Sequence, residues 1–199
     1  MPNKTSCEIK KIIESALLLV LSKGPEEVVE KLSSEYIPLL TGSFKKSTSP
    51  LLQYADSALA NGNSTTEEFL EQLRPIMSIL PWEYSYDERS DAPGLSARIG
   101  WAELVGPKAP FKSDKFCLGF TLIAPDTLYP EHNHPATELY YVLSGTANWT
   151  LDGKKASKKP GSVILHPSLH KHSMETKKET LLALYIWTGD DIVTLSEYT

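Results

Sequence analysis

Cysteine is scarce in this sequence, and that scarcity excludes several kinds of protein. Cys7 and Cys117 are the only cysteines in the 199 residues, and they lie too far apart for a C-x-x-C redox pair or a zinc finger. They cannot form a disulfide framework or a cysteine-based metal cluster, although one disulfide between the two stays open. A reduced, cytoplasmic protein is the simplest interpretation.

Long apolar runs and clusters of basic residues are missing as well. The most apolar stretch, residues 9–21, contains Glu14, is too short to span a bilayer and is followed by no small-residue cleavage site. The net charge is −5, and the sequence contains no cluster of Lys and Arg residues. We therefore expect no membrane and no nucleic acid as partner, and a small molecule instead.

Residues 1–81 have the pattern of a helical region. Apolar residues recur at the spacing of one helix face in residues 9–21, and Gly24 and Pro25 then mark the end of one helix and the beginning of the next. Further helices are predicted over residues 25–36, 49–62 and 64–77. Because the apolar stripes need a partner, we expect this region to cover one face of the remaining chain or to form a homodimer contact.

After Pro81 the pattern changes to short strands separated by turns. Runs rich in β-branched and aromatic residues occupy positions 116–124, 138–145, 147–153, 162–167 and 181–187. Turn dipeptides such as Gly106-Pro107 and Pro160-Gly161 lie between them. This grouping predicts a mainly β fold over residues 82–199, either a sandwich or a barrel, with a hairpin around Asp152-Gly153.

Histidine is confined to one part of the chain, which indicates a metal site. All five histidines lie between positions 132 and 172: His132, His134, His166, His170 and His172. Alternate residues of a strand share a face, so one set of even-numbered side chains would point together into a barrel. These are His132, His134, Glu138 and Tyr140, with Pro135 as a local disturbance. Two imidazoles, a carboxylate and a third imidazole from a neighbouring strand suit Fe(II), Zn, Mn, Ni or Co. Surface histidines beside a solvated glutamate are the plain alternative.

Two segments resemble the motifs of the cupin superfamily. "HNHPATELYYVLSG" is similar to the first motif, which is H-x-H, three residues, Glu, six residues and Gly, and "PGSVILHPSLHKH" is similar to the second. The resemblance implies a C-terminal cupin barrel (a double-stranded β-helix or jelly-roll) over residues 82–199. It implies four metal ligands: His132, His134, Glu138 and His172. His166 and His170 are then left over, and His170 either orients a ligand from outside the metal's own shell or is a solvated loop residue.

Helices before a cupin barrel, together with these tyrosines, resemble the cupin-type dimethylsulfoniopropionate (DMSP) lyases of the DddQ-like group. The resemblance implies a carbon–sulfur lyase that converts DMSP to dimethyl sulfide and acrylate by β-elimination, with one divalent transition metal ion. It implies Tyr140 as the base, in some members a metal ligand at rest. It also implies that Tyr129, Tyr140 and Trp187 line the substrate pocket.

Two other functions fit the same motifs, because a fold does not determine a reaction. One is another metal-dependent cupin enzyme, a dioxygenase or an isomerase, acting on a small carboxylate. The other is a cupin that binds a ligand without turning it over. Oxygen consumption would identify a dioxygenase, whereas a lyase should work without oxygen.

Overall fold

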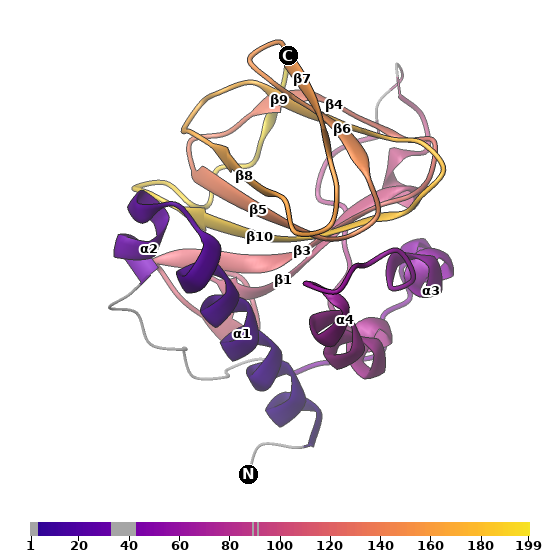
Figure 1. The fold of residues 1–199 in the computed structure, drawn as a ribbon, viewed down its shortest axis with the longest axis vertical. Coiled ribbons are helices and arrows are strands. Elements are labelled where there is room, and N and C mark those ends of the chain that lie inside the picture. The colour runs from indigo at the N-terminus through magenta and orange to yellow at the C-terminus, as the bar shows by residue number, and fades with distance from the viewer. Residues whose placement is uncertain (1–3, 33–42, 89, 91) are drawn as a thin grey trace.

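The helices of the chain lie on one side of a pair of β-sheets (Figure 1). The computed structural model describes residues 4–32, 43–88, 90 and 92–199. Within these ranges the α-helices come first, and the strands follow from Ile99 onward. This arrangement confirms the expected mainly β fold with a helical region in front of it. The division of the chain at residue 81 stays a prediction.

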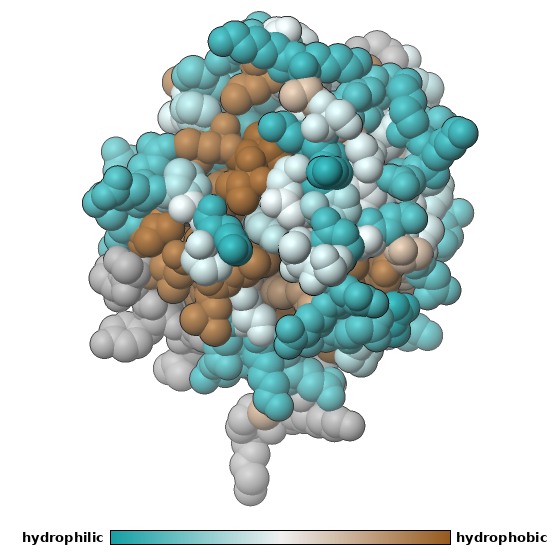
Figure 2. All heavy atoms as spheres, viewed as in Figure 1, coloured by the Kyte–Doolittle hydropathy of each residue, from teal (hydrophilic) through white to brown (hydrophobic). Residues whose placement is uncertain are grey.

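Helix α1, Lys4–Lys23, has the amphipathic pattern that its sequence predicts. Its buried residues recur at intervals of three and four: Ile9, Ile12, Ile13, Ala16 and Val20. Leu18 and Leu21 are 67% and 37% exposed, and Figure 2 shows apolar side chains where α1 lies, within a mostly polar surface. No helix in the described ranges is both long and apolar enough to cross a membrane.

The other helical segments are shorter than expected. Helix α2 begins after Gly24-Pro25, as predicted, and residues 33–36 of the expected helix lie outside the described residues. Each of the next two predicted helices is divided into an α-helical and a 3-10 part, and the second of them runs on to Ile79. The bounds are α2 Glu26–Leu32, η1 Pro50–Tyr54, α3 Ala55–Ala58, α4 Glu67–Leu73, η2 Arg74–Ile79 and η3 Leu95–Ala97.

The described strands form two sheets that face each other. The larger has the order β2-β1-β3-β10-β5-β8, with bounds Phe111–Lys112, Ile99–Gly106, Phe116–Ile123, Leu181–Thr188, Thr137–Ser144 and Val163–His166. The smaller has the order β11-β4-β9-β6-β7, with bounds Glu197–Tyr198, Leu128–Asn133, His172–Thr176, Ala147–Leu151 and Lys154–Lys158. Strands β6 and β7 form the predicted hairpin, and Asp152 and Gly153 at its turn both have positive φ, 47° and 75°.

The larger sheet is buried on both faces, which explains its long apolar runs. On strand β3, the even-numbered Phe116, Leu118 and Phe120 pack into the core shared with the helices. The odd-numbered Cys117 and Ile123 pack into a second core between the two sheets. The helices therefore cover the outer face, and the inner face is free to carry a site.

Candidate functional site

The first motif lies where the chain crosses from one sheet to the other. Strand β4 of the smaller sheet ends at Asn133, and β5 of the larger sheet begins at Thr137. The strand does not run through Pro135, so simple alternation is not what brings the even-numbered residues together. His132 comes from one wall of the barrel and Glu138 from the other, and their side chains are 2% and 3% exposed.

Strand pairing brings the second motif against the first. His172 lies opposite His132 in the β4–β9 pair, and His166 lies opposite Glu138 in the β5–β8 pair. Trp187 lies opposite Glu138 on the other side, in the β10–β5 pair. The site is therefore assembled by the register between strands that are distant in sequence.

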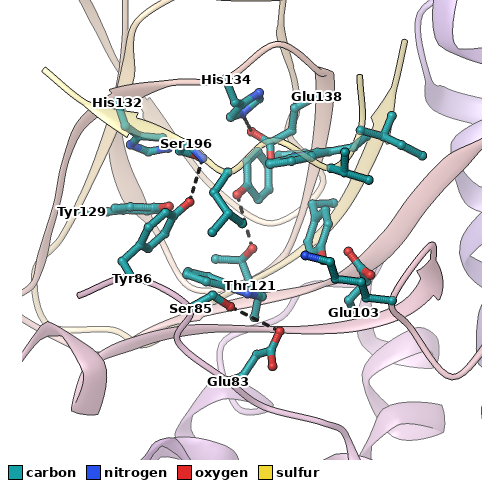
Figure 3. Close-up of a pocket in the computed structure, with 18 of the residues that line it drawn as sticks. Glu83, Ser85, Tyr86, Glu103, Thr121, Tyr129, His132, His134, Glu138 and Ser196 are labelled. Atoms are coloured by element: carbon teal, nitrogen blue, oxygen red, sulfur yellow. Dashed lines mark hydrogen bonds and ion pairs between the residues drawn. The ribbon is translucent and has the colours of Figure 1, made fainter. Parts of the chain in front are cut away.

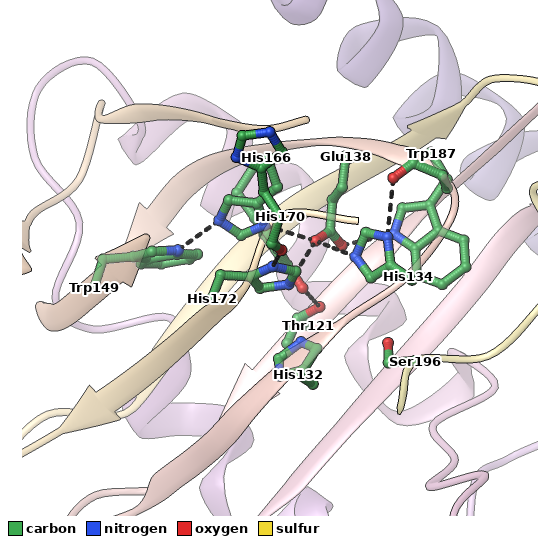
Figure 4. Close-up of polar contacts among 12 residues, drawn as sticks. Thr121, His132, His134, Glu138, Trp149, His166, His170, His172, Trp187 and Ser196 are labelled. Carbon is green, nitrogen blue, oxygen red and sulfur yellow. Dashed lines mark hydrogen bonds and ion pairs between the residues drawn. The ribbon is translucent and has the colours of Figure 1, made fainter. Parts of the chain in front are cut away.

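Four buried residues form a compact group at this place (Figure 4). One nitrogen or oxygen atom from each of His134, Glu138, His166 and His172 lies within 4.8 Å of the others. The expected set contained His132 where this group has His166. His132 lies next to the group, with its ring centroid 4.2 Å from that of His172, and it stacks on Tyr129 at 4.1 Å. The arrangement is a His/Glu cluster of the kind that binds a transition metal.

Glu138 is the centre of the hydrogen-bond network. Its Oε1 accepts from Trp187 Nε1 at 2.7 Å, and its Oε2 lies 3.1 Å from His134 Nε2 and 3.0 Å from His166 Nδ1. Burial alone would raise the pKa of this carboxyl group, but His134 and His166 hold the pKa well below its usual range. Glu138 is therefore a buried carboxylate anion, whose oxygen atoms are suited to bind a metal cation.

Three of the histidines are anchored through the same ring nitrogen. Nδ1 lies 2.7 Å from the Pro130 carbonyl oxygen in His132, 2.9 Å from Ala136 in His134 and 2.9 Å from the carbonyl oxygen of residue 170 in His172. Each carbonyl oxygen accepts a hydrogen bond from Nδ1–H, so the lone pair of a neutral ring lies on Nε2, as metal-binding histidines require. In His134 this Nε2 faces Glu138 Oε2; burial alone would lower the pKa of His134, but the charge of Glu138 outweighs burial and raises it.

His172 shows most clearly that the cluster fits a metal ion. Its Nε2 is buried and has no hydrogen-bond partner among the described residues. Burial, together with the nearby His166 and His132, lowers the pKa of His172 to about 2, so the ring is neutral at ordinary pH. Burial likewise lowers the pKa of His132 to about 4. An unpartnered imidazole lone pair beside a buried carboxylate is a ready metal ligand.

His166 differs from His132, His134 and His172 because both of its ring nitrogens contact side chains. Trp149 Nε1 donates to its Nε2 at 2.8 Å. An accepting Nε2 leaves the ring proton on Nδ1, which donates to Glu138 Oε2. His166 is thus placed to orient the carboxylate. Sequence reasoning left His166 without a role, because its pairing with Glu138 depends on strand register.

The side chain of His170 lies away from the cluster. It is exposed, and its Nδ1 lies 2.5 Å from Asp152 Oδ2. The contact that this residue makes with the site comes from its main chain, through the carbonyl oxygen that accepts from His172 Nδ1.

A pocket opens beside the cluster, and the predicted aromatic residues line it (Figure 3). Tyr140 is buried, and its hydroxyl lies 3.3 Å from Thr121 Oγ1. Burial raises the pKa of Tyr140 well above its ordinary value, and the charge of Glu138 raises it further. Trp187 packs against His134, with ring centroids 4.4 Å apart. Tyr129 also lines the pocket.

Fold and cluster together define the class: a cupin-like barrel that carries a buried His/Glu site. Comparison with known proteins names the family. The family model for dimethylsulfoniopropionate lyase matches residues 28–183, most of the chain, so the chain belongs to the DMSP lyase family.

Two curated relatives support this membership. The chain is 30% identical over 114 residues to the dimethylsulfoniopropionate lyase DddQ of Ruegeria pomeroyi, covering 57% of each protein. It is 34% identical over 120 residues to the DddL protein of Cereibacter sphaeroides, covering 60% of this chain and 50% of that one. The chain thus spans about half the length of the curated relatives it matches.

Solved structures share the fold over nearly the whole chain. A chain from the crystal structures of the DMSP lyases RdDddP and RnDddQII superposes with a TM-score of 0.79 and 21% identity, covering 94% of this chain and 98% of that one. The crystal structure of DMSP lyase DddQ from Ruegeria pomeroyi gives a TM-score of 0.74 and 21% identity, covering 96% of each chain. Both likenesses confirm the cupin-like barrel preceded by helices.

Proposed function

We propose that this protein is a metal-dependent lyase that cleaves DMSP by β-elimination to dimethyl sulfide and acrylate. The observation that carries the proposal is the buried His/Glu cluster beside a pocket that holds a tyrosine, in a chain of the DMSP lyase family. The atoms balance: a base takes one α-proton, the Cβ–S bond breaks, and dimethyl sulfide leaves as a neutral molecule.

The metal ligands that we propose are His132, His134, Glu138 and His172. Each of the three histidines has Nδ1 fixed to a carbonyl oxygen, which leaves Nε2 to bind. His166 is a neighbour of this set, because its Nε2 lone pair already accepts from Trp149 and its Nδ1–H donates to the carboxylate, so no lone pair is left for a metal. His134 Nε2 instead faces the carboxylate that would share the metal. A divalent metal ion bound there would hold the substrate carboxylate, offset the charge developing beside it and favour the Tyr140 phenolate.

Tyr140 is the base in this proposal. It lies two residues after Glu138 on the same strand face, and the Thr121 hydroxyl fixes the direction of its oxygen. A base must come within about 3 Å of the proton's carbon, or act through one water molecule. The buried position also limits the access of bulk water to the base. Tyr129 and Trp187 form the walls that orient the substrate.

The test is gas chromatography of the headspace for dimethyl sulfide. Purified protein is incubated with DMSP without oxygen, after loading with Fe(II), Mn(II), Zn(II) or Ni(II) in separate vials. We expect metal-dependent dimethyl sulfide, reduced about 100-fold or more in Tyr140→Phe. Tyr141→Phe is the matched control, because Tyr141 sits on the same strand but packs into the outer core. If no metal supports the reaction in the wild-type protein, the proposed function is wrong.

Elemental analysis tests the ligands separately from the reaction. We expect His134→Ala to lose bound metal after dialysis against a weak chelator. The exposed His170→Ala serves as control and should keep the wild-type metal content. Equal metal content in the two variants would contradict the assignment of His134.

A further inference from the structure

A glutamate that the cluster does not use faces the same pocket from the other side. Glu103 lies on β1, opposite Gly119 of β3, which is opposite Tyr185 of β10, which is opposite Tyr140 of β5. The four residues form one row across the inner face of the larger sheet, and Glu103, Tyr185 and Tyr140 all line the pocket. The row spans three strand spacings, about 14 Å between backbones, which leaves room for a small molecule between inward side chains.

Gly119 is what allows this row to hold a pocket. A Cβ atom at Gly119 would lie 2.8 Å from the Tyr185 ring, so the aromatic ring lies directly over the bare backbone. Gly106 does the same for the carboxylate, since a Cβ there would lie 2.5 Å from Glu103 Oε1. The absence of a Cβ atom at Gly119 and at Gly106 therefore leaves the space that the ring and the carboxylate group occupy.

The Glu103 carboxylate has no cationic partner within salt-bridge distance among the described residues. Burial raises its pKa to about 6; Cys117 works against that rise, and the charge of Glu83 adds to it. Lys108 and Lys112 have the smallest effects on the pKa, which they lower; both lysines are exposed, and Lys108 lines the same pocket. A half-buried carboxylate that ionises near neutral pH without a cationic partner costs free energy, and such groups concentrate at functional sites.

Aromatic side chains line the same pocket as this carboxylate (Figure 3). Trp101 is two residues before Glu103 on β1 and so shares its face, and its ring lies 5.2 Å from that of Tyr86 in an edge-to-face contact. Tyr185 is the next side chain after Glu103 along the row, because Gly119 between them has none. A sulfonium group has no N–H or O–H to donate, so only opposite charge and aromatic faces can recognise it.

We propose that Glu103, with the rings of Trp101 and Tyr185, binds the cationic end of the substrate. The proposal rests on the proposed function and adds to it the recognition of the sulfonium group. The pocket then has two electrically different ends. A divalent metal ion held by the histidine cluster would attract the carboxylate of the zwitterion, and Glu103 repels that carboxylate and attracts the cation. A zwitterion can enter productively in one orientation only, with its α-carbon toward Tyr140.

Two probes of the same shape isolate the charge. The first is 3-(trimethylammonio)propanoate, a permanent cation at one end, and the second is 4,4-dimethylpentanoate, which has a carbon atom in place of the nitrogen. Their binding to metal-loaded protein is measured by isothermal titration calorimetry at pH 8, without turnover. We expect Glu103→Gln to weaken the binding of the trimethylammonio probe about tenfold, which corresponds to about 1.4 kcal/mol, and to weaken the binding of its carbon analogue less than about twofold.

The matched control is Glu68→Gln, which removes the same charge from an exposed position on α4, on the opposite side of the larger sheet. This control should bind both probes as the wild type does. Equal weakening of both probes by Glu103→Gln, or no weakening of the cationic one, would overturn the proposal.

Kinetics with DMSP separate this proposal from the proposed function. If the lyase is active, Glu103→Gln should raise KM for DMSP about tenfold and leave kcat within about twofold, because the metal and Tyr140 are untouched. An unchanged KM would overturn the role of Glu103 while the lyase stands. The wild type could also form no dimethyl sulfide while Glu103→Gln still weakens the binding of the trimethylammonio probe alone. That result would overturn the lyase and leave the cation site standing.

Discussion

Replacing Glu103 by glutamine should stabilise the protein at pH 8 and not at pH 4. The pKa of this carboxyl group is raised from 4.5 to about 6 in the folded protein, and burial is the largest cause. Below pH 4.5 the group is neutral in both folded and unfolded chains and does not lower the free energy of unfolding. As the pH rises, the unfolded chain releases the proton first, so stability falls until the folded group has also ionised, above pH 6.

The size of the effect follows from the two pKa values. The difference between about 6 and 4.5 corresponds to about 2 kcal/mol of stability lost at pH 8. Glutamine has nearly the same shape, remains neutral and still accepts a hydrogen bond, so it avoids this cost. For a chain of this length, about 2 kcal/mol raises Tm by about 4–8 °C.

The assay is thermal unfolding followed by circular dichroism at several values between pH 4 and pH 8, with chelator present throughout. At each pH the Tm of the variant is compared with that of the wild type. The titration of the histidine cluster affects both proteins equally and does not contribute to the difference. We expect no difference near pH 4 and a growing advantage for Glu103→Gln above pH 5. A variant that is less stable than the wild type at every pH would show that Glu103 has a structural role, and our reasoning would be wrong.

Two further predictions concern orientation and backbone geometry. Trp149→Phe removes the donor that fixes the tautomer of His166, and we expect the metal affinity to fall about 10-fold or more, measured by competition with a chromogenic chelator; unchanged affinity would contradict a role in orienting the buried carboxylate. Gly145→Ala should cost about 2–4 kcal/mol in urea unfolding, because φ is +75° and the new Cβ would lie 2.1 Å from the Thr180 carbonyl oxygen. Gly94→Ala is the control, since φ is similar but no atom lies within 4 Å, and it should cost about 1 kcal/mol; equal losses would contradict the steric argument.

The opposite effects expected for Glu103 on stability and on binding are connected. A residue kept for packing alone would be replaced at a cost to stability. Here the same uncompensated charge that lowers stability is the charge that a cationic ligand would neutralise. Such a conflict between stability and ligand binding is usual where a protein keeps a group for its function.

Much of the fold could be predicted because its signals are local. The apolar spacing of residues 9–21 predicted α1, and the β-branched and aromatic runs predicted β3, β5, β6, β8 and β10. Helices over residues 49–62 and 64–77 were predicted at too great a length, since 3-10 segments take part of each. The strands β1 and β4 lack so clear a run, because their residues alternate less regularly between core and pocket.

The sequence by itself determined that a metal site should exist in a β-barrel, because the five histidines and Glu138 stand in one region at motif spacing. It also determined the candidates Tyr129, Tyr140 and Trp187. Only the tertiary structure decided that His166 contacts the carboxylate, that the His170 side chain stays outside, and that Glu103 faces the pocket. Those outcomes depend on which residues lie opposite each other in strands 16 to 66 positions apart, as in the pairs Glu138–His166, Glu103–Gly119 and Gly119–Tyr185. Strand register is set by the packing of the whole barrel, and no local pattern contains it.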